Sequence, residues 1–198
     1  MEAILPEQHA TSYLNYPYQE YVLAAVPDEA SSERLMEERN QFYHQFKLAR
    51  TSFLAPQIFM AGFLAKEGME ENLLRWIQNI SRLHPVFELS VLEYTINPPD
   101  MLSLNMEASS SYRQLTLSLN MIDGFIQAND CPPIYVSANP QMVMAANLPP
   151  AVIKRAGEYY DHLPYKMNLH IEKILLIKRS GSHAAYQTVS SIRLSGSA

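Results

Sequence analysis

A six-residue segment occurs twice in this chain, and this repeat constrains the fold more than any other feature of the sequence. The first copy spans residues 56–61 (Pro-Gln-Ile-Phe-Met-Ala) and the second spans residues 140–145 (Pro-Gln-Met-Val-Met-Ala). Four of the six positions are identical, and the two glutamines are 84 residues apart (141 − 57). Each copy is typical of a β-strand that begins at a proline, where a missing backbone N–H matters least. A repeated element predicts a duplicated fold, and the alternative is a chance match between two unrelated buried strands.

Side chains alternate between the two faces of a strand, so each copy places two pairs of residues on opposite faces. The residues that share one face are Gln57 and Phe59 in the first copy, and Gln141 and Val143 in the second. The other face carries Ile58 and Met60, and Met142 and Met144.

The composition excludes several classes of protein. A net charge of −5 argues against a general nucleic-acid-binding surface, which needs clustered Lys and Arg. The one cysteine, Cys131, cannot form an internal disulfide. The six histidines have no HExxH or HxH spacing and the six glycines form no phosphate-binding loop, so we expect no metal and no cofactor. No signal peptide and no uninterrupted apolar run of about 18 residues occur, which predicts a cytoplasmic protein without membrane spans.

Hydrophobic periodicity and turn residues predict an alternation of strands and helices. The predicted strands are 21–26, 53–64, 86–96, 101–106, one within 135–146, 168–178 and 186–194. The predicted helices are 28–48, 70–83, 112–127 and 149–162. Residues 1–19 have no clear period and are interpreted as an N-terminal arm, packed on the surface or partly disordered. Residues 20–195 are predicted to form one domain.

The order of these elements supports a duplication. Counting from each repeated strand gives the same run twice: strand, helix, two strands. This indicates an α+β fold with two pseudo-symmetric lobes, whose antiparallel sheets lie side by side with helices on the outside. The two repeated strands then lie near the symmetry axis, and Gln57, Phe59, Gln141 and Val143 face each other across a central cleft.

This arrangement resembles the 2H phosphoesterase superfamily, which includes bacterial 2′-5′ RNA ligases and cyclic nucleotide phosphodiesterases. Each family motif is a strand running Pro-His-x-Thr, and the two motifs match residues 56–59 and 140–143. The segment Gly62-Phe63-Leu64 and the closing strand at 174–179, with Tyr186 behind it, are also similar. The resemblance covers roughly residues 20–195. It implies a reaction on a 2′,3′-cyclic or 2′-5′ phosphodiester, in which two histidines exchange protons and two threonine hydroxyls hold the phosphate.

All four matching positions differ in this chain. Gln57 and Gln141 replace the histidines, and Phe59 and Val143 replace the threonines. An amide does not exchange protons near neutral pH, and each lost acid–base group typically removes ~10²–10⁴ in rate. We therefore predict that the family reaction is absent and that the chain is not an enzyme.

Three hypotheses follow. The first is a catalytically silent relative whose cleft binds a small ligand, a nucleotide or another phosphate-containing molecule, through Gln57, Phe59, Gln141 and Val143. The second is a structural or protein-interaction protein with a filled cleft. The third is a phosphodiesterase or RNA ligase that uses other residues. The oligomeric state is not predicted.

Overall fold

The computed structural model describes residues 18–48, 55–181 and 184–196. The strands are β1 (Tyr18–Pro27), β2 (Ile58–Lys66), β3 (Phe87–Asn97), β4 (Met101–Glu107), β5 (Tyr135–Val136), β6 (Gln141–Ala145), β7 (Pro164–Arg179) and β8 (Gln187–Arg193). The α-helices are α2 (Glu29–Gln45), α3 (Glu70–Arg82), α4 (Ser110–Leu119), α5 (Asp123–Gln127) and α6 (Pro150–Tyr160). Of the predicted arm, only Tyr18 and Gln19 are described, and they open β1. The first two residues of the predicted strand 53–64 also lie outside the described residues.

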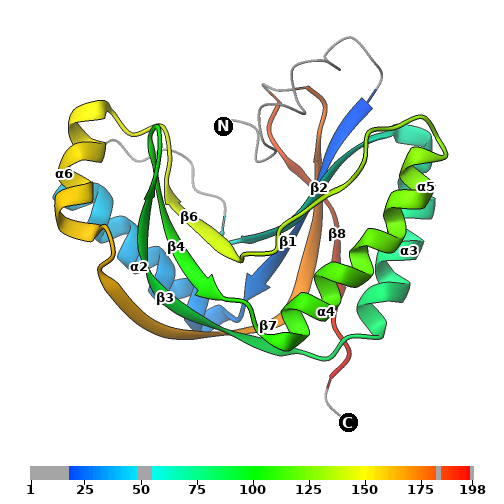
Figure 1. Ribbon diagram of the computed structural model, residues 1–198, viewed down its shortest axis with the longest axis horizontal. Helices are drawn as coiled ribbons and strands as arrows, with labels where there is room; N and C mark the ends of the chain where they lie inside the picture. The colour runs from blue at the N-terminus through cyan, green and yellow to red at the C-terminus, as the bar shows by residue number, and fades with distance from the viewer. Residues whose placement is uncertain (1–17, 49–54, 182–183, 197–198) are drawn as a thin grey trace.

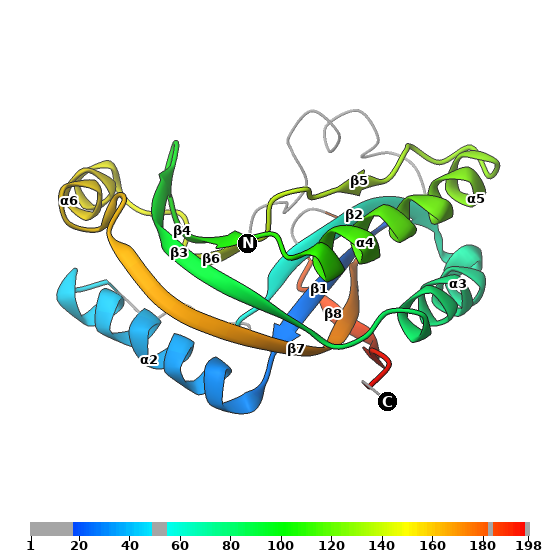
Figure 2. The ribbon, with the colours of Figure 1, turned by 60° about the horizontal axis from the view of Figure 1, so that its bottom comes forward.

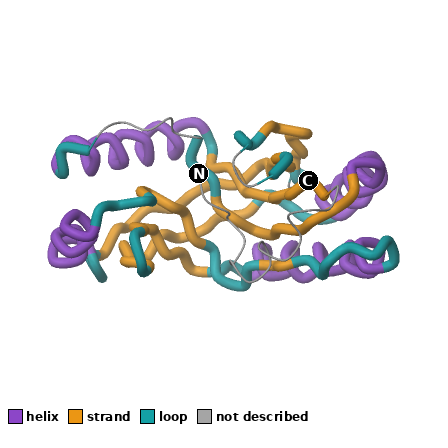
Figure 3. Tube along the Cα trace, turned by 90° about the horizontal axis from the view of Figure 1, so that it is seen from above, coloured by secondary structure: helices purple, strands orange, loops and turns teal. Residues whose placement is uncertain are grey.

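The strands form one antiparallel sheet in the order β5-β2-β1-β7-β3-β4-β6, with β8 also paired to β7. The predicted α+β class, with antiparallel strands and outer helices, is confirmed. The repeated run is also present, as β2-α3-β3-β4 and then β6-α6-β7-β8. Figure 1 shows α2 and α6 at one end of the molecule and α3, α4 and α5 at the other. The view from above in Figure 3 shows the same separation, with the strands between the two groups of helices.

The long strand β7 joins the two lobes into one sheet. Its first half pairs with β3, up to Ile171 opposite Phe87, and its second half pairs with β1 and β8. Where the two halves meet, Val26 pairs with Lys173 but Pro27 pairs with Ile171, so Glu172 is the extra residue of a β-bulge. Figure 2 shows β7 curving along the base of the molecule, with α2 on its convex side.

This bulge corrects one expectation from the sequence. Simple alternation predicts that Leu169, Ile171, Leu175 and Ile177 share a face. The core instead contains Leu169 and Ile171 from the first half of β7, and Ile174 and Leu176 from the second half. The extra residue changes the phase of the alternation, because side chains after a bulge lie one position out of register with those before it.

Helix boundaries follow local chemistry. Asp28 caps α2, because its carboxylate accepts a hydrogen bond from the Ser31 backbone N–H (2.9 Å). α6 begins at Pro150, where the fixed φ of proline suits a first turn. The prediction of one continuous helix over residues 112–127 is wrong, because a 3₁₀ turn at Asn120–Ile122 separates α4 from α5. Asn, Asp and Gly are weak helix formers, and Asn120, Asp123 and Gly124 cluster at this break.

The core is one cluster that includes residues from all five α-helices and most strands. In the part of the chain that the structure describes, no helix is long and apolar enough to cross a membrane.

Candidate ligand-binding site

The two repeated segments contain the same structural irregularity. In β2, Leu23 pairs with Ala61 and Ala24 pairs with Phe59, so Met60 has no partner across the strand. In β6, Leu102 pairs with Ala145 and Ser103 pairs with Val143, so Met144 has no partner. Each repeat is therefore a strand with a β-bulge at its Met-Ala pair. Bulges re-aim the side chains around them and are frequent beside functional sites.

The bulge fixes which side chains enter the core. Ile58, Met60 and Ala61 are completely buried in the core, as is Met142, while Met144 and Ala145 are 2 % exposed. The residue before each bulge lies on the opposite face, which we call the inner face because it is turned away from the core cluster. Val143 is 43 % exposed there, and Gln57, Phe59 and Gln141 are partly buried. The predicted division of each repeat into two faces is confirmed.

The two repeats also lie side by side. Residues of β2 and β6 have Cα atoms within 8 Å of each other, although the two strands are not paired in the sheet (Figure 1). The predicted strand within 135–146 is β6, and a further short strand, β5, precedes it on the other lobe, because the chain crosses between the lobes after β5. The Ser137 N–H donates to the Met60 carbonyl (2.8 Å), and three residues later the Pro140 carbonyl accepts from the Met106 N–H (3.1 Å).

Tyr112 of α4 supports this crossing from the core side. Its hydroxyl donates to the Ser137 carbonyl (3.1 Å) and lies 3.5 Å from the carbonyl oxygen of Phe59. Burial raises the pKa of Tyr112 to about 12, so the hydroxyl remains a donor at neutral pH. One buried side chain thus links the strand that carries Phe59 to the segment that leads into Gln141.

The inner face of the β3-β4-β6 lobe is polar. Residues that pair directly across neighbouring strands share a face, and two such rows cross this lobe. The first row is Glu93, Asn105 and Gln141, and the second is Thr95, Ser103 and Val143. Gln141 Nε2 donates to Asn105 Oδ1 (2.8 Å), and Asn105 Nδ2 donates to Thr95 Oγ1 (2.6 Å). The amide of Gln141 is therefore held by a neighbouring strand.

The inner face of the β2-β1-β7 lobe is mainly apolar. The rings of Phe59 and Tyr135 stack with centroids 5.7 Å apart and planes 26° apart, and Tyr135 is 39 % exposed. Further into the lobe, Val22, Ala24 and Ile177 are only 1–3 % exposed. At the far end, Arg179 forms a buried ion pair with Glu20 (2.6 Å), and Glu20 also accepts from the Tyr186 hydroxyl (2.7 Å). The accessible part of the inner face thus lies at the Phe59 and Val143 end.

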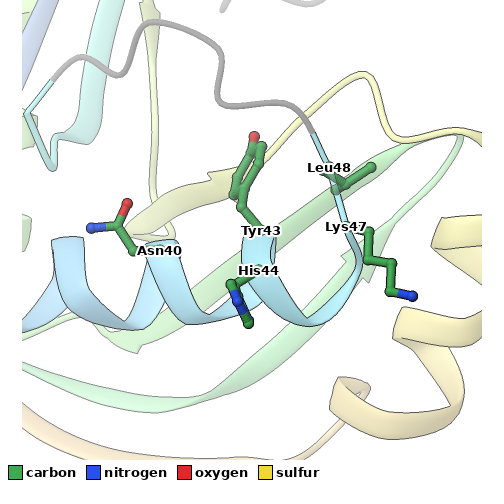
Figure 4. A pocket seen from close by; sticks show the side chains of 5 residues that line it. All are labelled: Asn40, Tyr43, His44, Lys47 and Leu48. Carbon is green, nitrogen blue, oxygen red and sulfur yellow. The ribbon is translucent and has the colours of Figure 1, made fainter.

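Two pockets lie elsewhere on the surface, and none of the four residues predicted from the sequence lines either of them. A pocket of about 430 Å³ lies at the C-terminal end of α2 and is lined by Asn40, Tyr43, His44, Lys47 and Leu48 (Figure 4). A smaller pocket of about 190 Å³ lies on α3. Among the described residues, no group of three His, Cys, Asp or Glu side chains could hold a metal ion.

Sequence reasoning missed the partners of the predicted residues, namely Tyr135, Asn105, Thr95 and Glu93. A signal for three of them was available. The segments that form β3 and β4 alternate polar and apolar residues in the sequence, with Glu93, Thr95 and Asn97 in the first and Ser103 and Asn105 in the second. A strand pair that alternates in this way has one face outside the core.

Comparison with known proteins agrees with this architecture. No protein-family model matches the chain, and no curated protein matches it in sequence. Solved structures do match. TT0787 of Thermus thermophilus superposes with a TM-score of 0.64 at 13 % identity, over 89 % of this chain and 98 % of that chain. E. coli LigT complexed with phosphate gives 0.62 at 14 % identity, over 91 % and 99 %. A structure described as a phosphoesterase gives 0.64 at 14 % identity, over 89 % and 98 %. The chain therefore has the fold of TT0787, of LigT and of the structure described as a phosphoesterase, which confirms the fold that the resemblance implied.

Proposed function

We propose that this protein binds a small ligand, of the nucleotide class or similar in size, at the inner face between β2 and β6, and that it does so without acid–base catalysis. The observation that carries the proposal is the position of Gln57 and Gln141. Each glutamine lies three residues before the unpaired methionine of an equivalent bulge, Gln57 directly before β2 and Gln141 at the start of β6, and these two strands lie side by side. A cytoplasmic location, predicted from the sequence, belongs to the same proposal.

The loss of catalysis follows from the chemistry of these side chains. Two-step proton exchange needs groups whose pKa lies near the working pH, and a carboxamide has no such pKa. Phe59 and Val143 also lack the hydroxyls that would hold phosphate oxygens. Each missing acid–base group removes roughly 10²–10⁴ in rate, so both together leave little turnover.

Retention of ligand binding is supported by what the site still offers. Gln141 has hydrogen-bonding capacity beyond its bond to Asn105, because a carboxamide has two N–H donors and an acceptor oxygen. Phe59, Tyr135 and Val143 supply apolar surface that is partly open. LigT, which shares the fold, has been crystallised with phosphate, 3′-AMP, ATP and NADP⁺.

The proposal makes two requirements of the purified protein. It should not turn over a 2′,3′-cyclic nucleotide above the background of a mock purification. It should bind at least one member of a panel of nucleosides, nucleotides and cyclic phosphates saturably in calorimetry, and Gln141→Ala should weaken that binding. Gln187→Ala is the matched control, because Gln187 is an exposed glutamine on β8. Turnover that survives further purification would establish the active phosphodiesterase instead.

A filled inner face is the second candidate, and one observation favours it. Val22, Ala24 and Ile177 lie on the inner face yet are almost fully buried. In a structural or protein-interaction protein the whole face would be closed. Then Val22→Asn and Val143→Asn would both cost stability as core substitutions do, and no ligand of the panel would bind. If the β6 end is open, only Val22→Asn lowers the free energy of unfolding strongly.

A further inference from the structure

The chain of hydrogen bonds from Gln141 through Asn105 to Thr95 determines which atoms of Gln141 are available to a ligand. Its Nε2 donates to Asn105 Oδ1 at 2.8 Å, and Asn105 in turn donates to Thr95 Oγ1 at 2.6 Å. Among the described residues, none donates to Gln141 Oε1. One Nε2 N–H is engaged by Asn105, so Gln141 has its acceptor oxygen and its second N–H available for a ligand. A carbonyl oxygen accepts hydrogen bonds and does not donate them.

The inner face of the β3-β4-β6 lobe also carries a negative charge in the row of Gln141. The row that holds Gln141 also holds the carboxylate of Glu93, directly opposite Asn105. The second row, Thr95, Ser103 and Val143, is neutral. His162 lies 3.4 Å from the Glu93 carboxylate and is mostly exposed. A phosphate group carries negative charge, and the Glu93 carboxylate in the row of Gln141 repels it.

The neighbouring lobe provides a surface for a flat group. Phe59 and Tyr135 form a near-parallel pair (5.7 Å, 26°), and Tyr135 is 39 % exposed. Val143, also 43 % exposed, belongs to β6, whose Cα atoms approach those of β2 within 8 Å. A nucleic-acid base stacks favourably on an exposed aromatic side chain, because every base has a flat π face. The aromatic pair and the acceptor oxygen thus belong to strands that lie side by side.

We infer that the site recognises a neutral planar heterocycle that carries an N–H donor, the chemistry of a nucleobase, and that it does not recognise phosphate. The ring stacks on the Phe59 and Tyr135 pair, and its N–H donates to Gln141 Oε1. This inference rests on the proposed function and narrows it, because nucleotides are bound through the base and their phosphate adds no affinity.

Calorimetric titration of the full chain tests the inference. The probes are the four ribonucleosides, their 3′-monophosphates and inorganic phosphate. At least one nucleoside should bind saturably, its 3′-monophosphate should bind no more tightly, and excess inorganic phosphate should not displace it. Tyr135→Leu and Gln141→Leu should each weaken nucleoside binding by roughly tenfold or more. Gln187→Leu on β8, outside the proposed site, should leave it unchanged.

The role of Asn105 in positioning the Gln141 amide has its own readout, the ratio of affinities for nucleoside and 3′-monophosphate. Asn105→Asp keeps an acceptor for Gln141 Nε2 and should preserve or increase the preference for the nucleoside. Asn105→Leu releases the amide and should reduce that preference, which a change in stability alone would not do.

The possible failures are distinguishable. A 3′-monophosphate that binds roughly tenfold tighter than its nucleoside, or displacement by inorganic phosphate, overturns this inference and leaves a ligand-binding site in place. Absence of binding by every nucleoside also overturns it. Absence of binding by the nucleotides and cyclic phosphates as well overturns the proposed function.

Discussion

Met60 and Met144 are the unpaired residues of two equivalent β-bulges, one in each lobe of the sheet. Both are buried in the core, and each is followed by a buried alanine, Ala61 or Ala145. The bulge keeps the methionine and the alanine on the core side together, which ordinary alternation does not allow. The preceding residues then point to the inner face. The repeated sequence Met-Ala is therefore explained by a repeated backbone feature, which supports a duplication over a chance match.

The bulge geometry predicts that substitutions at two adjacent residues of β6 lower the free energy of unfolding by unequal amounts. Met144→Ala should lower the free energy of unfolding by roughly 2–4 kcal/mol, because it leaves a cavity in the core. Val143→Ala should cost less than about 1 kcal/mol, because that side chain is 43 % exposed. Urea denaturation of both variants checks the pair. If Val143→Ala were the more costly of the two, the strand would face the other way.

The hydroxyl of Tyr112 gives a prediction about alkaline pH. Tyr112→Phe should cost about 1 kcal/mol at pH 7, because the partly buried hydrogen bond to the Ser137 carbonyl is lost. Burial raises the pKa of Tyr112 to about 12, above its unfolded value near 10. A raised folded pKa means that stability is present below pH 10 and falls as pH rises toward 12. In denaturant titrations, the free energy of unfolding of Tyr112→Phe should fall less steeply between pH 9 and 11 than that of wild type. Tyr159→Phe, at an exposed site, should follow wild type.

Much of the fold could be predicted because it depends on local patterns. The capping aspartate before α2, the proline at the start of α6 and the β3-β4 hairpin each have a short sequence signature. The face on which Val143 and Phe59 lie followed from alternation alone. The proximity of β2 and β6 followed from the predicted duplication and the resemblance, because nothing in either segment encodes the packing of distant strands.

The remaining features depend on long-range contacts. The bulge at Glu172 joins two lobes and appears only when β1 and β3 are both paired to β7. The separation of β5 from β6 reflects long-range pairing, because β5 pairs with β2 and β6 pairs with β4. The hydrogen bonds from Gln141 to Asn105 and from Asn105 to Thr95 require three strands in register. The sequence therefore predicted Gln141 as a site residue but not its two partners.

The N-cap of α2 gives a prediction about acid pH. Asp28→Ala should cost about 1 kcal/mol at pH 7, because the Ser31 N–H loses its acceptor. The hydrogen bond from the Ser31 backbone lowers the pKa of Asp28 below its ordinary value. A lowered folded pKa gives stability above the unfolded pKa, and that stability is lost as pH falls through the folded pKa. The difference in free energy of unfolding between wild type and Asp28→Asn should therefore shrink below about pH 4. Chemical denaturation at pH 7 and pH 3 measures it, and a difference that stays constant would argue against a charged cap.

The buried pair of Arg179 and Glu20 predicts a non-additive result. Arg179 Nε lies 2.6 Å from Glu20 Oε2, and the side chains are 1 % and 11 % exposed. Glu20→Gln or Arg179→Met alone should cost roughly 3–5 kcal/mol, because each removes one half of a buried ion pair. The double variant should cost less than the sum of the two, since it removes both charges. The same cycle at the exposed pair Arg75 and Glu71 on α3 should show a coupling below about 1 kcal/mol. Equal coupling at both pairs would mean that Glu20 and Arg179 remain hydrated in solution, and the far end of the inner face would then be open.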